Sequence, residues 1–266
     1  MNRKSASVLL LGIFISAACG DGDSPTSPDP ATPSPGSVVS SSTIPGARSQ
    51  EQLPENFPIK RILCFGDSVT LGVTAMGDSS YGGRTQLQLV EGYPVKLWRL
   101  LEEKYGVGFD VVSAGIGGEN TREGLERIDN EIRIHDPDLV LILEGVVDIN
   151  NEFPRYPVVR SSLAEMMRLV QLRGRLGIIG TYPLLNPDGF RTSGWGNVPR
   201  LNDVIRQEAK AKNMPVADHE KAFDADHSGL GPDGLHPNNI GYEIMAETWL
   251  EQIDLILEDL GVGTGT

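Results

Sequence analysis

Short apolar segments alternate along this chain with longer segments that carry apolar residues at helical spacing. Five short segments are rich in Val, Ile and Leu and predict buried strands at residues 59–65, 109–113, 139–144, 176–181 and 216–217. The longer segments predict helices at residues 93–104, 121–135, 158–173, 197–212 and 240–260. Strands that alternate with helices form crossover units and parallel sheets. The alternation therefore predicts a three-layer α/β domain with a parallel sheet between two layers of helices.

The first 19 residues have the pattern of an export signal. A basic start is followed by an apolar run at residues 8–15, which is too short to span a bilayer permanently. The small residues before Cys19 resemble a bacterial lipobox, although Ser16 stands where such boxes more often carry Leu, and ordinary cleavage after Ala18 is the alternative. We expect an exported protein of the bacterial cell envelope, periplasmic or on the outer surface, attached to the membrane only through a lipidated Cys19.

Residues 20–57 predict a flexible tether between the anchor and a folded domain. The segment is rich in Ser, Pro and Thr and nearly devoid of aromatic residues, so it cannot bury enough apolar surface to offset its ordering entropy. The predicted organisation is a signal peptide at residues 1–19, a disordered linker at 20–57 and one folded domain at 58–262.

The net charge, the cysteines and the histidines limit the kinds of binding partner and of catalytic chemistry that the sequence predicts. The formal net charge of −13 gives an acidic surface that repels phosphate backbones, so we expect no nucleic-acid partner. Cys64 lies inside the first predicted strand, where a small buried hydrophobic side chain is expected, and Cys19 is the other cysteine. The histidines show no metal-ligand spacing. The sequence predicts neither a cofactor nor a metal ion.

The first predicted strand ends abruptly in the sequence RILCFGDSVT. Ligands of open parallel sheets bind at the carboxyl ends of the strands, so Ser68 lies at the edge where a site is expected. Asp and Ser are also ordinary helix caps and turn formers after a strand. Ser68 is therefore either a turn residue or a nucleophile held at the end of the sheet.

The sequence GPDGLHPNN, before the last predicted helix, carries a base and a carboxylate. A serine hydroxyl is a weak nucleophile until a base takes its proton, and neutral imidazole suits that task near pH 7. A carboxylate on the other ring nitrogen fixes the tautomer and stabilises the imidazolium. Ser68, His236 and Asp233 would supply all three catalytic roles, while the alternative for Asp233 is a cap of the final helix.

Together these segments resemble the SGNH hydrolases, the GDSL-like esterases and lipases. The family's first block appears as FGDSVTLG, with Val69 where the name-giving motif has Leu, and its last block appears as DGLHP. The resemblance covers nearly all of residues 59–258. It implies a flavodoxin-like α/β/α sandwich with a five-stranded parallel sheet, and a serine ester hydrolase that works through an acyl-enzyme intermediate.

The resemblance also implies an oxyanion hole, built partly from backbone N–H groups. The segment SAGIGGENT matches the family's second block, in which Gly118 is the best-aligned position. Gly115 and Gly117 are alternatives if the glycine-rich turn is registered differently. The backbone N–H groups of Ser68 and Gly118 are the donors expected from this match.

The third block departs from the family. Where the family carries G-x-N-D, residues 145–148 read GVVD, so Val147 occupies the position of an Asn that donates a hydrogen bond to the oxyanion. Loss of one such donor costs on the order of 100- to 1000-fold in turnover. Asn150 and Asn151 are the candidates for a substitute donor, while the alternative for each is a loop or cap residue. The valine favours, as an alternative function, a non-catalytic fold that binds glycan or lipid.

Aromatic residues in two loops are the substrate clues. Tyr81 and Arg84 follow the nucleophile segment, and Tyr182, Phe190 and Trp195 follow the fourth predicted strand. Such aromatic side chains stack on sugars, line acyl pockets or pack loops down. No apolar lid helix of the kind expected for long-chain lipids is predicted. We expect an esterase for small acyl groups on alcohols or carbohydrates, with a lysophospholipase or lipase as the alternative.

Overall fold

A five-stranded parallel sheet forms the centre of the fold in the computed structural model, which describes residues 51–76, 86–150 and 153–263. The strands are β1 (Arg61–Gly66), β4 (Asp110–Gly115), β5 (Leu139–Leu143), β6 (Leu176–Gly180) and β7 (Val216–Ala217). They lie in the order β4-β1-β5-β6-β7, and all neighbours are parallel. In chain order among themselves this is 2-1-3-4-5, the order of flavodoxin-like sheets. The predicted fold class is confirmed.

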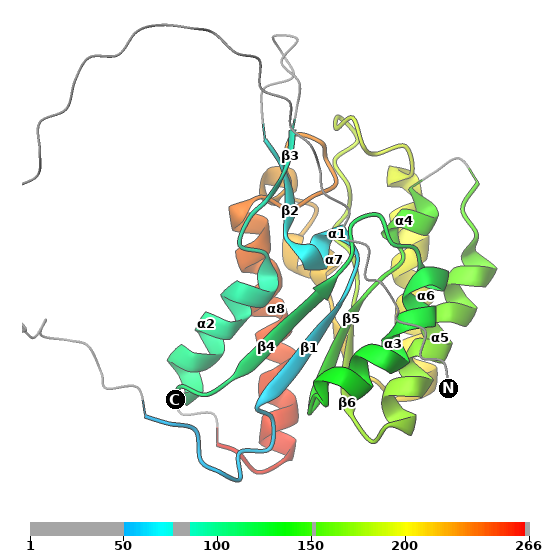
Figure 1. Ribbon diagram of the computed structural model, residues 1–266. Coiled ribbons are helices and arrows are strands. Elements are labelled where there is room, and N and C mark those ends of the chain that lie inside the picture. The colour runs from blue at the N-terminus through cyan, green and yellow to red at the C-terminus, as the bar shows by residue number, and fades with distance from the viewer. Residues whose placement is uncertain (1–50, 77–85, 151–152, 264–266) are drawn as a thin grey trace, which may run out of the picture. The chain divides into compact units, whose positions relative to one another are not determined.

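Helices cover both faces of the sheet (Figure 1). On one face, α2 (Tyr93–Tyr105) packs beside α8 (Asn239–Asp259). On the other face lie α3 (Thr121–His135), α5 (Tyr156–Leu172) and α6 (Val198–Lys212). All five helices were expected from the helical spacing of their apolar residues, which their buried faces explain.

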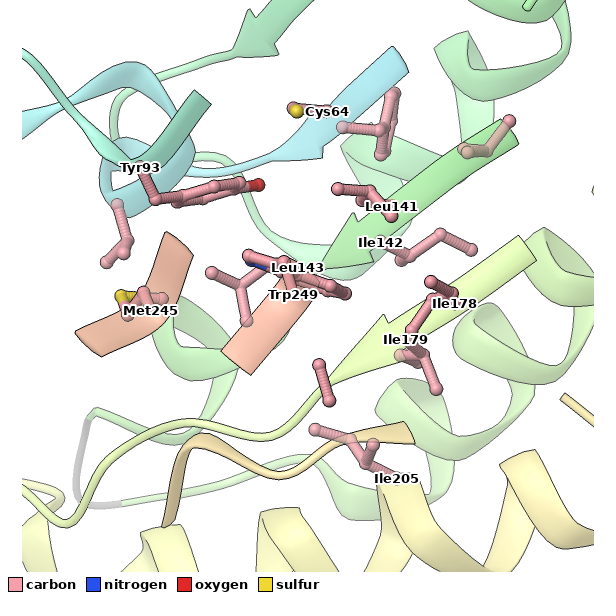
Figure 2. Close-up of a cluster of buried hydrophobic side chains, with 14 of the residues drawn as sticks. Cys64, Tyr93, Leu141, Ile142, Leu143, Ile178, Ile179, Ile205, Met245 and Trp249 are labelled. Carbon is pink, nitrogen blue, oxygen red and sulfur yellow. The ribbon is translucent and has the colours of Figure 1, made fainter. Parts of the chain in front are cut away.

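The core forms where these layers meet, as Figure 2 shows. All five residues of β5 are buried, because this central strand is covered by helices on both faces. Trp249 of α8 and Tyr93 of α2 fill one side of the sheet with their rings 5.8 Å apart. Cys64 is fully buried in β1 with a free thiol, and burial raises its pKa, so it behaves as the small buried hydrophobic side chain that was expected.

The structure also contains elements too short for a periodic pattern to predict. An antiparallel hairpin joins β2 (Val73–Met76) to β3 (Gln86–Leu89). The remaining short elements are α1 (Ser68–Leu71), α4 (Val146–Ile149), α7 (His219–Phe223) and the 3₁₀ turns η2 (Trp195–Asn197) and η3 (His227–Gly229). Most of these short elements follow the carboxyl ends of the parallel strands, where ligands of such sheets bind.

Several predictions concern segments outside the described residues. The predicted signal peptide, the lipobox-like Cys19 and most of the linker fall there, as do Tyr81 and Arg84. In the ranges that are described, no helix has the length and hydropathy needed to cross a membrane.

His219, at the start of α7, is a titratable residue whose side chain lies in the apolar core. Its ring is fully buried and lies edge-on to Trp249, with the ring centroids 5.0 Å apart. Within the described part of the chain, neither ring nitrogen has a hydrogen-bond partner. Burial lowers the pKa of His219 to about 3, although the nearby Asp218 carboxylate acts in the opposite direction.

We expect this buried histidine to make the fold sensitive to acid. Below pH 6.5 the unfolded chain binds a proton at this position, whereas the folded chain stays neutral until about pH 3. The contribution of His219 to the free energy of unfolding therefore falls by about 1.4 kcal/mol per pH unit across this range, or about 2 kcal/mol between pH 7 and pH 5. The raised pKa of the buried Asp67 carboxyl acts in the opposite direction over the same range. Urea unfolding of the wild type and of a variant without this histidine, each at pH 7 and pH 5, measures this contribution.

The variant His219→Leu isolates the contribution of this side chain from that of the carboxylates. Between pH 7 and pH 5, the free energy of unfolding of this variant should fall by about 2 kcal/mol less than that of the wild type. His227→Leu, which replaces a half-buried histidine in η3, is the matched control and should follow the wild type. An equal loss in wild type and His219→Leu would contradict a neutral buried imidazole.

Candidate active site

Ser68 is held at the carboxyl end of β1 by a sharp turn into α1. The turn needs a glycine at position 66, because a Cβ atom there would overlap the Leu143 carbonyl oxygen of β5 and the side chain of Thr70. β1 can therefore end close against β5, and α1 starts directly afterwards. Ser68 is the first residue of α1, with 8% of its surface exposed.

Asp67 stabilises this turn through two hydrogen bonds of its carboxylate. It caps α1, since its Oδ1 accepts a hydrogen bond from the Val69 N–H at 2.8 Å. Its Oδ2 accepts a hydrogen bond from the Tyr182 hydroxyl at 2.6 Å. Burial raises the pKa of Asp67 to about 6, against the opposing effect of these two hydrogen bonds. Asp67 thus ties the turn before Ser68 to the chain that follows β6.

The same contact decides between the alternatives for Tyr182. Of the roles considered for this aromatic residue, the structure shows inward packing, because Tyr182 is 1% exposed and lies beneath Asp67. Its amide N–H and carbonyl also bond the side chain of Asn202 in α6, at 2.9 and 2.8 Å. Tyr182 is therefore a buried support of the turn.

The loop before α8 brings His236 and Asp233 to Ser68. His236 Nε2 lies 3.0 Å from Ser68 Oγ, and His236 Nδ1 lies 2.6 Å from Asp233 Oδ2. Asp233 Oδ1 accepts the backbone N–H groups of Leu235 and His236, which fixes the carboxylate in its turn. All three predicted side chains are buried or nearly so, and they form one continuous line of hydrogen bonds.

The environment of Asp233 favours its ionised form. Burial by itself raises the pKa of Asp233, but the hydrogen bonds and charge of His236 and the two backbone N–H groups outweigh it and hold the pKa below its ordinary value. A carboxylate on Nδ1 directs the proton of a neutral imidazole to that nitrogen. His236 Nε2 is then the nitrogen available to accept the proton of Ser68.

The glycine-rich turn after β4 contributes two of its three candidate glycines to the site. Gly117 and Gly118 line a cavity together with Ser68 and His236. Gly118 has a φ of 79°, in the left-handed region that favours glycine. Gly115, in contrast, is the last residue of β4 and packs so closely on α1 that no side chain would fit. Gly118 remains the expected oxyanion donor, with Gly117 as its neighbour on the cavity wall.

An ion pair that the sequence did not point to fixes the end of this turn. Glu119 is almost fully buried, and Arg127 of α3 donates to both of its oxygens, at 2.6 and 2.5 Å. Arg127 also donates to the carbonyl oxygens of Gly66 and Ala114, so it clamps the ends of β1 and β4 together. The pair joins a loop to a helix across the sheet edge, and no periodic pattern marks such a contact.

Val147 lies in α4 and lines the same cavity as Ser68 and Gly118. The next residue, Asp148, accepts the backbone N–H and the hydroxyl of Thr121 at 2.8 and 3.2 Å, which fixes α4 against the start of α3. The segment is thus held in place at the cavity wall. A valine side chain offers no hydrogen-bond donor there.

Asn150, one of the two residues considered as a substitute donor, has the structural role of a loop and cap residue. Its Nδ2 donates to the Arg191 carbonyl at 2.7 Å, and its Oδ1 accepts the Gly194 N–H at 2.9 Å. These bonds hold the loop after β6 against α4. Asn150 also borders the cavity, while Asn151 lies outside the described residues.

The cavity at Ser68 has a volume of about 290 Å³ and mainly apolar walls. Its apolar lining comes from the hairpin, from α4 and from the loop before α8: Val73, Leu87, Val146, Val147 and Leu235. Phe190 and Trp195 are about half exposed and do not belong to this lining. In the ranges that the structure covers, no cluster of three His, Cys, Asp or Glu side chains is arranged to hold a metal ion.

Comparison with known proteins finds one family along most of this domain. Residues 64–244 match the GDSL-like lipase/acylhydrolase family. An acetylxylan esterase of Geobacillus stearothermophilus is 26% identical over 215 residues, which are 73% of this chain and 94% of the relative. A multidomain esterase of Ruminococcus flavefaciens is 30% identical over 127 residues, and this chain spans only 16% of its length.

Solved structures with the same fold have similarly low sequence identity. A lipase/acylhydrolase from Enterococcus faecalis superposes with a TM-score of 0.62 at 24% identity, covering 73% of this chain and 95% of the other. A carbohydrate acetylesterase from Sinorhizobium meliloti has the same TM-score at 17% identity, with 74% and 99% covered.

Proposed function

Because the chain belongs to the GDSL-like lipase/acylhydrolase family, we propose that it is a serine esterase that releases small acyl groups from alcohols or carbohydrates. The enzyme class, a carboxylic ester hydrolase, follows from the family and from relatives named as esterases. One observation carries the mechanism: the line of hydrogen bonds from Ser68 through His236 to Asp233.

The first half of the reaction forms an acyl-enzyme. Ser68 Oγ attacks the ester carbonyl carbon while His236 Nε2 takes the hydroxyl proton. The Asp233 carboxylate, 2.6 Å from Nδ1, holds the ring in place and stabilises the imidazolium that forms. The backbone N–H groups of Ser68 and Gly118 stabilise the oxyanion. When the tetrahedral intermediate collapses, His236 gives its proton to the departing alcohol.

The second half releases the acid. Water attacks the acyl carbon of the ester on Ser68, and His236 again accepts a proton as the oxyanion forms. Collapse of this intermediate returns the proton to Ser68 Oγ and frees the carboxylic acid. The enzyme ends in its starting state.

The size of the cavity supports a small acyl group. At about 290 Å³ it lies just below the range for ligand sites, roughly 300–1,000 Å³. Leu87 and Leu235 form part of its apolar wall, where a long chain would have to displace them. The names of the relatives, an acetylxylan esterase and a carbohydrate acetylesterase, are in line with an acetyl group on a sugar.

Hydrolysis of p-nitrophenyl esters of increasing acyl length tests this proposal. We expect kcat/KM to be highest for acetate to butyrate and to fall about tenfold or more by octanoate, because overpacking an apolar cavity costs about 1–3 kcal/mol. A rate that rises with chain length would instead favour the lipase alternative.

A matched pair of variants in the hairpin sharpens the test. Leu87→Ala opens the cavity wall and should move the optimum to longer acyl chains. Leu89→Ala, in the same strand β3 but outside the cavity lining, should leave the profile unchanged. Equal profiles for the two variants would contradict an acyl site at this wall.

A further inference from the structure

A second and larger cavity lies on the other side of Val147. Its volume is about 710 Å³, and its lining comes from the start of α3, from α4 and from the chain that leads into α5. Val147 belongs to the lining of both cavities, so the larger cavity adjoins the cavity that holds Ser68 at this side chain. A substrate attached at Ser68 can therefore extend past Val147 into the larger cavity.

The larger cavity is lined mainly by polar side chains of mixed charge. The charged groups of the lining are two arginines and three carboxyl groups, so neither charge is in strong excess: Arg122, Arg155, Glu123, Glu126 and Asp148. Such a set offers hydrogen-bond donors and acceptors together. It suits an uncharged ligand rich in hydroxyl groups better than a phosphate, a carboxylate or a lipid chain.

An exposed aromatic side chain lies among these polar groups. Phe153 belongs to the lining of the larger cavity, and 81% of its surface is exposed. Aromatic rings provide rigid apolar faces that pack against the C–H face of a sugar ring. An aromatic face among mixed polar groups is a combination that fits a carbohydrate.

The two cavities differ in size and polarity, and this difference assigns the acyl group of an ester to one cavity and the alcohol to the other. The cavity at Ser68 is small and largely apolar, which suits the acyl group. The larger and polar cavity suits the alcohol from which the acyl group is removed. A long acyl chain in the larger cavity would contact charged side chains and leave them poorly solvated.

We propose that the cavity beyond Val147 is a leaving-group subsite that binds neutral sugar rings next to the acylated one, with Phe153 as a stacking platform. This inference rests on the proposed esterase function and specifies its substrate class as acylated oligosaccharides. The subsite makes an acetylated oligosaccharide a better substrate than an acetylated monosaccharide.

Kinetics of the full chain test the subsite. We expect kcat/KM for acetylated xylotetraose to exceed that for acetylated xylose by about tenfold or more. The variant Phe153→Ala should lower the ratio of kcat/KM for acetylated xylotetraose to that for p-nitrophenyl acetate by about tenfold. Phe190→Ala is the matched control, since Phe190 is also exposed, at 54%, but lines neither cavity; its ratio should equal that of the wild type.

Calorimetric titration separates failure of the subsite from failure of the esterase function. Unacetylated xylotetraose should bind the full chain and Phe190→Ala with the same affinity, and Phe153→Ala about tenfold more weakly, whether or not esters are hydrolysed. Equal binding and equal ratios in both variants would overturn the subsite, while hydrolysis of p-nitrophenyl acetate would leave the esterase function intact. Binding that depends on Phe153 without any ester hydrolysis would support the subsite and contradict the esterase.

Discussion

Ser68→Ala is expected to lower the rate of p-nitrophenyl acetate hydrolysis by at least about 10⁴-fold. The substitution removes the atom that attacks the ester, and no other step of the proposed mechanism replaces it. The backbone N–H groups and the cavity remain, so a small rate above the reaction in water should persist. The fold should persist as well, because the only hydrogen bond described for the Ser68 hydroxyl is that with His236.

Initial rates and covalent labelling with a fluorophosphonate probe measure this effect together. The wild type should be labelled, and Ser68→Ala should not be. Ser193→Ala is the matched control: its hydroxyl donates to the Asn150 carbonyl in a nearby loop, but Ser193 does not line the cavity. Equal hydrolysis by the wild type and Ser68→Ala would mean that Ser68 is only a turn residue and would favour the non-catalytic alternative.

Val147→Asn should produce the largest gain, an increase in kcat of about 100- to 1000-fold. The family places an oxyanion donor at this position, and here a valine lines the cavity beside Ser68 and Gly118. The hydrogen bonds of Asp148 with Thr121 keep α4 in place whichever side chain stands at position 147. A donor that acts mainly on the oxyanion stabilises the transition state more than the bound ester, so kcat should rise while KM changes little.

Two further variants at the same position separate the effect of a hydrogen-bond donor from the effect of side-chain size. Val147→Ala widens the junction of the two cavities without adding a donor, and Val147→Leu narrows it. Both should keep the low kcat of the wild type. If Val147→Ala gains as much as Val147→Asn, the valine limits access to Ser68; if no variant gains, position 147 does not face the oxyanion.

The five parallel strands and five long helices were predictable from the sequence because each depends on a local pattern. A strand buried on both faces, such as β5, appears as a continuous apolar run, and an amphipathic helix such as α3 repeats its apolar residues about every turn. The hairpin of β2 and β3 was missed because its strands are short and many of its residues are exposed. Its Val73 and Leu87 nevertheless line the cavity at Ser68.

The residues of the site also divide into those that short sequence motifs predicted and those that only the packing of the chain placed. Ser68, Asp233 and His236 could be chosen as candidates because each lies in a short motif at the end of an element, and the structure brings their side chains together. For Tyr182 the sequence left open whether the ring lines the site or packs inward, since an aromatic residue in a loop has the same sequence pattern in both cases. Its hydroxyl bond with Asp67 spans 115 positions of the chain.

The sequence by itself determined the order of the elements, the three-layer α/β class and the three side chains proposed for catalysis, because periodicity and short motifs are local properties, while the flavodoxin-like topology was implied by the family resemblance. Only the tertiary structure decided that Arg127 clamps two strand ends beside the oxyanion turn and that Val147 borders two cavities of different size and polarity. The physical reason is that these features join segments far apart in the chain. Their distances depend on how the whole sheet and its loops pack, and a local pattern contains no information about that packing.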